Sequence, residues 1–192
     1  MEMPSYSYPL DPMVNEPGWK DITDGCEPFV RKFLARATEL FGPPTNLMPV
    51  RVTELKSAPR TCFHDGIADI RVGQGVSANP DGHDLKGQIA HEIVHVLSKR
   101  KVRNTVLEEG LCTYFAVNYG GEHAPHAGDT NERKYYEACE AVTGLLKKRF
   151  TVIKELRESP RSFDDISADE IRQLCPDYPG DFKHLVSEFG AK

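Results

Sequence analysis

No stretch of this 192-residue chain has the continuous apolar run that a membrane-spanning helix requires, so we expect no membrane span. The first residues lack a basic start and an apolar core, and we therefore expect no cleaved signal peptide. The protein is thus predicted to be cytoplasmic, or exported without such a peptide. A basic excess is missing too: 24 lysines and arginines stand against 29 aspartates and glutamates. Nucleic-acid-binding proteins normally present a basic face, so nucleic acid is not an expected partner.

Paired cysteines, internal repeats and low-complexity tracts are also absent. The cysteines are odd in number, widely spaced and without a C-x-x-C pair: Cys26, Cys62, Cys112, Cys139 and Cys175. We therefore expect reduced, buried thiols rather than a disulfide framework. Hydrophobic residues make up 39% of the chain and charged residues 28%, which is typical of a soluble globular protein. The length suits one domain with a real core.

Among the residues that are present, the stretch His91-Glu92-Ile93-Val94-His95 is the most informative. Two histidines four residues apart on a helix lie on the same face, one turn apart, and can bind one metal ion. Glu92 projects beside that ion, where it can take a proton from water. The stretch therefore matches the H-E-x-x-H pattern of metalloproteases, in which one helical turn supplies two zinc ligands and a general base.

The surrounding residues favour a buried helix for this stretch. Apolar residues recur at steps of three and four positions, at Leu85, Ile89, Ile93, Val96 and Leu97. Asp84 precedes the run and is a suitable N-cap. Histidines in so apolar a helix require partners for their ring nitrogens, which favours a metal site.

The rest of the chain predicts a small sheet followed by helices. Residues 1–22 carry four prolines with interleaved tyrosines and predict an extended arm. A helix with a capped start at Asp24 is expected to end at Gly42. Alternating runs over 50–55 and 67–72 predict two strands, and an open edge beside the motif could pair with a peptide.

Further helices are expected over residues 105–117, over 130–158 with an interruption at Gly144, after the capping box Ser167–Glu170, and over about 180–189. The predicted fold class is therefore α+β. Residues 23–192 are expected to form a single, mostly helical domain with a small antiparallel or mixed sheet before the motif helix.

A catalytic zinc ion needs three protein ligands and an open position for water, so a third ligand must come from elsewhere. Metzincins continue the motif with a glycine and a third histidine at fixed offsets. Those offsets hold Ser98 and Lys101 here, which excludes that class. Cys112, His123 and His126 are rival donors, but a deformylase-like site would carry its cysteine upstream of the motif.

The segment Glu108-Glu109-Gly110, followed by Tyr114, gives a better answer. Together with the motif, it resembles the gluzincin branch of the zincin metallopeptidases over about residues 67–119. The resemblance implies that a glutamate just before glycine on the next helix is the third ligand, which matches Glu109. Thirteen residues separate His95 from Glu109, fewer than in many gluzincins, and the choice between Glu108 and Glu109 stays open at this point.

These residues predict a zinc-dependent peptidase with one Zn²⁺ per chain, held by His91, His95 and Glu109, and a peptide or protein as substrate. Glu92 is expected to act as the general base. Candidate donors to the oxyanion of the transition state are Tyr114, Tyr135, Tyr136, His123 and His126. Acidic residues that could orient the histidines are Asp65, Asp69, Glu108 and Asp129. The alternative is a non-catalytic zinc-binding or pseudo-peptidase protein that serves as an interaction module.

Overall fold

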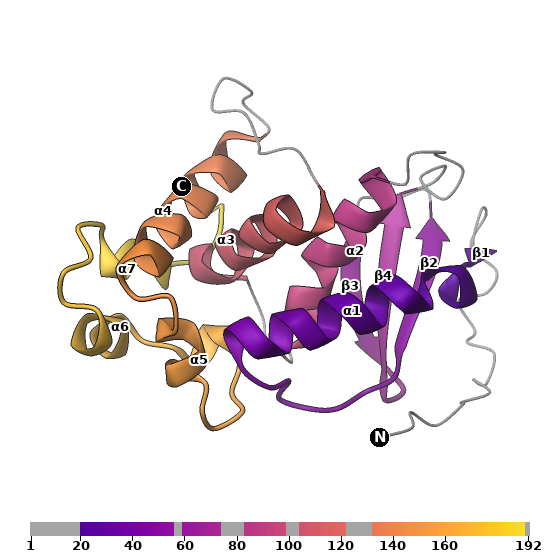
Figure 1. Ribbon diagram of the computed structural model, residues 1–192, viewed down its shortest axis with the longest axis horizontal. Helices are drawn as coiled ribbons and strands as arrows, with labels where there is room; N and C mark the ends of the chain where they lie inside the picture. Colours follow the sequence, from indigo (N-terminus) through magenta and orange to yellow (C-terminus); the bar gives the residue numbers. More distant parts are fainter. Residues whose placement is uncertain (1–19, 56–58, 74–82, 99–103, 122–131, 191–192) are drawn as a thin grey trace.

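A mixed sheet of four strands forms one end of the molecule, and helices form the other (Figure 1). The structure is a computed structural model and describes residues 20–55, 59–73, 83–98, 104–121 and 132–190. The strands are β1 (Lys20–Asp21), β2 (Val50–Leu55), β3 (Arg60–His64) and β4 (Ile67–Gly73), in the order β1-β2-β4-β3. β2 and β4 are parallel, and the other two pairings are antiparallel. Residues 1–19 of the predicted arm, 1–22, lie outside the described residues, and β1 is formed by residues 20 and 21 of that arm.

The strand β3 was not predicted, and it changes the interpretation of the sheet edge. It joins β4 through Asp65 and Gly66, whose φ values of 49° and 75° are those of a tight hairpin turn. β3 therefore forms one edge of the described sheet, while β4 lies between β2 and β3. The prediction that the strand just before the motif helix has an open edge is wrong, because β3 covers it.

Side chains alternate between the two faces of the sheet. Val52, Ile70 and Val72 point to the face that joins the hydrophobic core. Asp69 points to the opposite face, where it pairs with the guanidinium groups of Arg51 and Arg71. Helices pack on the core-facing side, whereas the opposite face carries these buried ion pairs.

The helix α1 (Thr23–Phe41) crosses the core-facing side of the sheet and packs on β2 and on the motif helix (Figure 1). Its start is two residues earlier than predicted, because the N-cap is Ile22 and the prediction placed it at Asp24. Asp24 lies inside the first turn, so its prediction as the cap is wrong, and the carboxylate of Asp21 accepts a hydrogen bond from the Thr23 amide at 2.9 Å. The helix ends at Gly42, as predicted, where φ is 90°.

The motif lies on α2 (His83–Val96), and α3 (Val106–Phe115) packs against it. Asp84 falls inside α2 instead of preceding it, so its prediction as the N-cap is wrong. Thr105 caps α3 by accepting a hydrogen bond from the Glu108 amide. The helix continues as a π-helical turn, η3 (Ala116–Gly120), which packs on α2 and ends at Gly121.

The long helix predicted over residues 130–158 is two helices, α4 (Arg133–Lys148) and α5 (Val152–Leu156). The break is at Arg149, which is extended, and Gly144 lies inside α4. The guanidinium of Arg149 bonds to Glu155 and to the Leu174 carbonyl, and these contacts fix the turn.

The chain then continues through η4 (Phe163–Asp165), α6 (Ala168–Leu174) and α7 (Phe182–Leu185). The predicted capping box at Ser167 and Glu170 is present at the start of α6. The last helix is shorter than the predicted 180–189, because the chain leaves α7 to pair with the residues before α3.

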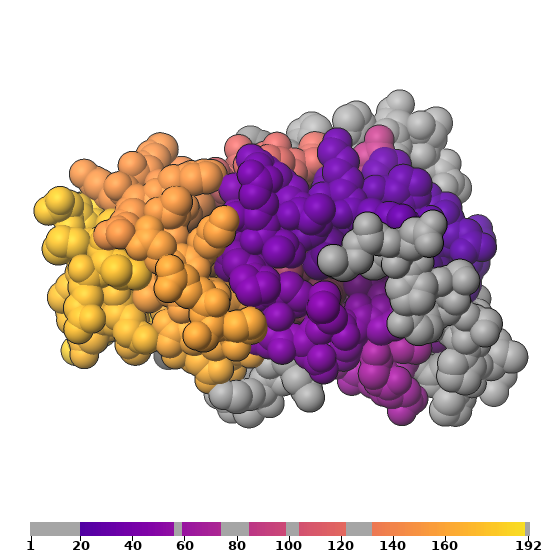
Figure 2. Space-filling view, turned by 60° about the horizontal axis from the view of Figure 1, so that its bottom comes forward, coloured from indigo at the N-terminus to yellow at the C-terminus, as the bar shows by residue number. Residues whose placement is uncertain are grey.

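One cluster of buried side chains runs from α1 and the sheet to α7. In the space-filling view, the indigo surface of α1 meets the orange surface of the C-terminal helices without a gap (Figure 2), in agreement with the packing of α1 on α5. The predicted α+β class is confirmed. Within the described ranges, none of the helices combines the length and the apolarity needed to cross a membrane.

Candidate metal centre

The two histidines of the motif lie on one face of α2, as their spacing predicts. Their ring centroids are 5.5 Å apart. The side chain of His95 is buried at 2% exposure, whereas that of His91 is 19% exposed and marks the open side of the site. The site is therefore a half-enclosed pair of imidazoles between α2 and α3.

The first turn of α3 brings two buried glutamates to this pair, each to a different side. Oε1 of Glu108 lies 2.9 Å from Nδ1 of His95. Oε2 of Glu109 lies 3.4 Å from Nε2 of His91, and its Oε1 lies 3.7 Å from Nε2 of His95. Of the two candidates, Glu109 thus faces both Nε2 atoms, while Glu108 binds the far nitrogen of His95.

These distances fit a shared metal ion. Donor atoms on a tetrahedral zinc ion lie about 3.3 Å apart when each bond is about 2.0–2.1 Å. The distance from Oε2 of Glu109 to Nε2 of His91, and that from its Oε1 to Nε2 of His95, are near this spacing. Glu108 would meanwhile hold the His95 ring by its other nitrogen, the role that carboxylates commonly have beside metal-binding histidines. The residues that are present therefore fit a zinc ion in donor type, and the Glu109 carboxylate lies near each of the two histidines.

Cys112 offers a second set of donors. Its sulfur and one ring nitrogen each of His91 and His95 all lie within 4.8 Å of one another. However, the sulfur is nearly equidistant from Nε2 and Nδ1 of His95, at 3.5 and 3.6 Å. A thiolate that shares a tetrahedral ion with Nε2 would lie about 5 Å from Nδ1 of the same ring. The sulfur is therefore beside the ring and not beyond Nε2, which favours Glu109 as the third donor.

The clustered charges shift the pKa values of the site. Burial alone would lower the pKa of His95, but Glu108, Glu92 and Glu109 outweigh it and raise the pKa to about 9. Burial alone would raise the pKa of Glu109, but the nearby His91 and His95 lower it to about 2. Glu109 is therefore an ionised carboxylate at neutral pH, as a zinc ligand must be.

Glu92, the predicted base, is buried and lies between α2 and the edge strand β3. Its Oε2 accepts a hydrogen bond of 2.8 Å from the hydroxyl of Thr61. Its charge is close enough to raise the pKa of both His95 and Tyr135. The carboxylate is thus beside the histidine pair, where the motif predicts a base.

Of the predicted oxyanion donors, Tyr135 on α4 is brought to the histidines. Its ring centroid lies 6.3 Å from that of His91. Burial, followed by the charges of Glu109 and Glu92, raises the pKa of its hydroxyl, so the group stays protonated at neutral pH. Tyr136 is the next residue and projects about 100° away around the helix.

The remaining predicted residues are elsewhere or lie outside the described residues. Tyr114 lies near Tyr119 and Cys139. Burial is the main cause that raises the pKa of Tyr114, and the charges of these two residues raise it further. Asp65 is exposed in the hairpin turn and Asp69 is on the far face of the sheet, and the histidine that both of them contact is His64 instead of His91 or His95. His123, His126 and Asp129 lie outside the described residues.

Three further residues contribute to the site and were not predicted from the sequence. Thr61 binds Glu92, and the amide of Asn104 donates to Oε1 of Glu109. The ring of Phe189 is tilted by 51° against that of Tyr135, with centroids 5.0 Å apart, and the Phe189 amide donates to the Asn104 carbonyl. The Asp65-Gly66 pair is a signal that could have revealed β3 and hence Thr61.

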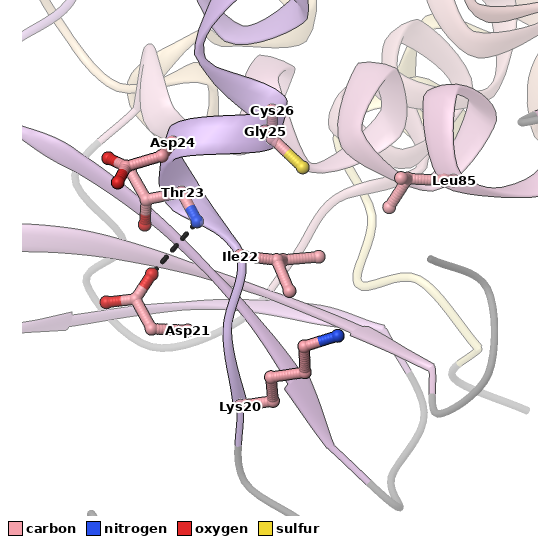
Figure 3. A pocket seen from close by; sticks show the side chains of 8 residues that line it. All are labelled: Lys20, Asp21, Ile22, Thr23, Asp24, Gly25, Cys26 and Leu85. Carbon is pink, nitrogen blue, oxygen red and sulfur yellow. Dashed lines mark hydrogen bonds between the residues drawn. The ribbon is translucent and has the colours of Figure 1, made fainter. Parts of the chain in front are cut away.

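A pocket of the described residues lies away from this site, between the starts of α1 and α2 (Figure 3). It is lined by residues 20–26 and by Leu85, with the side chains of Ile22, Cys26 and Leu85 facing one another. Leu85 is about 9 Å along α2 from His91 at 1.5 Å per residue. The pocket contains none of the predicted site residues.

Comparisons with protein-family models, with curated proteins and with solved structures found no match for this chain.

Proposed function

We propose that the protein is a zinc-dependent peptidase of the gluzincin type, with His91, His95 and Glu109 as the residues that hold the zinc ion. The proposal is carried by the position of the Glu109 carboxylate, 3.4 Å and 3.7 Å from the Nε2 atoms of the two histidines. A carboxylate that merely suits the N-terminus of a helix does not have to face both ring nitrogens. A zinc ion bound there would lower the pKa of a water molecule and polarise the carbonyl of a substrate.

The side chains around this position have separate tasks. Glu92 accepts the proton of the attacking water and returns it to the leaving amine. The hydroxyl of Tyr135, beside His91, donates a hydrogen bond to the oxyanion as the carbonyl carbon becomes tetrahedral. Glu108 holds His95 by its Nδ1 atom and keeps Nε2 directed toward Glu109.

The edge strand β3 supports a peptide as the substrate. An edge strand has backbone groups available to pair with an extended chain, and such pairing fixes a peptide without reading its sequence. β3 also carries Thr61, which contacts Glu92. A peptide paired along β3 would therefore have its backbone near the base.

The test is peptide cleavage by the wild type and by Glu92→Gln. Both proteins are incubated with a diverse peptide mixture, and the products are identified by mass spectrometry. We expect about one zinc per chain in both proteins and cleavage by the wild type alone, with a loss of at least about 100-fold in Glu92→Gln. Glu158→Gln, at an exposed position two residues after α5, is the matched control and should cleave normally. Equal cleavage by the wild type and Glu92→Gln would exclude the mechanism.

The alternative is a non-catalytic zinc protein, and the position of Cys112 is the observation that favours it. If its thiolate joined the two histidines and Glu109, four protein ligands would close the shell and leave no place for water. Cobalt substitution distinguishes the two cases, because a thiolate ligand gives a charge-transfer band in the near ultraviolet. We expect no such band in the wild type. A band that disappears in Cys112→Ser would favour the interaction module.

A further inference from the structure

Glu92 is held by a residue that lies outside the motif and outside the motif helix. The hydroxyl of Thr61 on β3 is 2.8 Å from Oε2 of Glu92 and 3.0 Å from its backbone carbonyl oxygen. Both residues are buried at 3% exposure. The hydroxyl therefore touches the side chain and the backbone of the same residue, which defines the direction of the carboxylate relative to α2.

The register of the sheet explains why Thr61 reaches this place. Thr61 is paired with Ile70 of β4, whose side chain is in the hydrophobic core. Cross-strand partners share a face, so Thr61 points to the core-facing side of the sheet, toward α2. A valine would fill this apolar position equally well. The hydroxyl is thus a polar group whose described partner is Glu92.

We propose that Thr61 is a positioning residue for the general base, an inference that rests on the proposed function. A free glutamate side chain samples several rotamers, and a base must be within hydrogen-bond reach of its proton to act. The Thr61 bond occupies Oε2 and leaves Oε1 as the oxygen that accepts the proton from water. Because Thr61 belongs to the edge strand, the strand that would pair with a substrate also fixes the base.

The test compares three substitutions at buried threonines. Thr61→Val keeps the shape and removes the hydroxyl, whereas Thr61→Ser keeps the hydroxyl. Thr53→Val is the matched control: Thr53 is also buried on a strand and donates to a buried carboxylate, Asp69, at 3.0 Å, but on the opposite face of the sheet.

We expect Thr61→Val to lower kcat by about 10- to 100-fold, as a misplaced catalytic group does, with KM and zinc content within about twofold of the wild type. Thr61→Ser should recover most of kcat. Thr53→Val should lower the melting temperature as Thr61→Val does and leave kcat unchanged. In the Glu92→Gln background, Thr61→Val should cause no further loss, because its effect is exerted through Glu92.

Three results contradict the inference, and they differ from one another. A wild type that depends on Glu92 but keeps its kcat in Thr61→Val overturns the positioning role alone. A wild type that cleaves no more peptide than Glu92→Gln overturns the proposed function and the inference with it. A loss of kcat in Thr53→Val equal to that in Thr61→Val assigns the effect to general destabilisation, and this also contradicts the inference.

Discussion

His95 is the most enclosed imidazole of the candidate site, and three carboxylates surround it. Its pKa of about 9 means that it is protonated at pH 7 when no metal is bound, and it then neutralises part of the charge of Glu108, Glu92 and Glu109. A protonated imidazole carries a proton on each ring nitrogen, so it has no free lone pair with which to bind a metal ion. Zinc and a proton therefore compete for the same residue.

This competition predicts how zinc affinity depends on pH. The pKa of His95 is about 9, so below that pH each rise of one pH unit gives about ten times more neutral His95. The zinc affinity should therefore rise about tenfold between pH 7 and pH 8 and level off near pH 9. Glu109, with a pKa of about 2, is already ionised and adds nothing over this range. Competition with a chromophoric chelator across the pH series measures the affinity.

Glu108→Gln is the informative variant for this prediction. It removes the hydrogen bond and the charge that most strongly raise the pKa of His95, so the affinity should level off at a lower pH than in the wild type. Glu158→Gln should follow the wild type. A zinc affinity that is constant between pH 7 and pH 9 would contradict the proposed competition.

At the scale of elements, the glycine after Glu109 fixes how closely two helices approach. A Cβ atom at Gly110 would lie 2.4 Å from the Ala138 carbonyl oxygen and 2.6 Å from a methyl group of Val142, both on α4. α4 therefore packs against the backbone of α3 just beside the third donor. The glycine of the Glu-Gly pair has a packing role in this fold, and α4 carries Tyr135 to the site.

Gly110→Ala should consequently push α3 and α4 apart. We expect a loss of about 3 kcal/mol in the free energy of unfolding, at the upper end for overpacking, since backbone atoms cannot rotate away. Urea denaturation measures it. Gly144→Ala is the matched control on α4: its Cβ would meet only a ring carbon of Tyr178 at 3.5 Å, an ordinary contact, so it should be neutral or slightly stabilising. Equal effects of the two substitutions would show that the close approach does not matter.

The elements that were predicted correctly have strong local signals. The apolar spacing of α1, the alternation of β2 and β4, and the capping box of α6 depend on residues close together in the sequence. β3 was missed because its segment, Arg60–His64, is mostly polar and becomes a strand by pairing with β4. The break at Arg149 was missed because contacts with Glu155 and Leu174 produce it.

The candidate site divides in the same way. His91, Glu92 and His95 are adjacent on one helix, so their spacing alone predicts their arrangement. Glu109 was predicted only through the gluzincin resemblance, and the structure brings it, rather than Glu108, to the Nε2 atoms. Thr61 and Phe189 come from distant segments, and no local pattern in the sequence indicates that they meet the motif.

At the scale of the whole molecule, one buried cation joins the sheet-side helices to the C-terminal half. The Arg157 guanidinium donates to the carbonyl oxygens of Phe41, the last residue of α1, and of Leu97, just after α2, at 2.8 and 2.7 Å. It also donates to Pro43 and lies over the ring of Phe163. Burial lowers its pKa to about 10, which leaves it charged at neutral pH.

Arg157→Lys should therefore destabilise the protein although the charge is kept. An ammonium group lacks the planar fork that reaches several carbonyl groups at once, so buried acceptors lose their donors. We expect a loss of about 3 kcal/mol in the free energy of unfolding. Arg133→Lys, at an exposed position on α4, is the control and should be indistinguishable from the wild type. Urea denaturation of both variants checks this, and a stable Arg157→Lys protein would contradict the linking role.

The pairing of the residues near Phe189 with those before α3 has a consequence for the order of synthesis. The ribosome makes the two histidines and Glu109 well before it makes Ser187, which accepts a hydrogen bond from the Val106 amide, and Phe189, which backs Tyr135 beside His91. Chains fold progressively as they emerge. The wall of the site next to His91 is therefore completed only after the two histidines and Glu109 have been made.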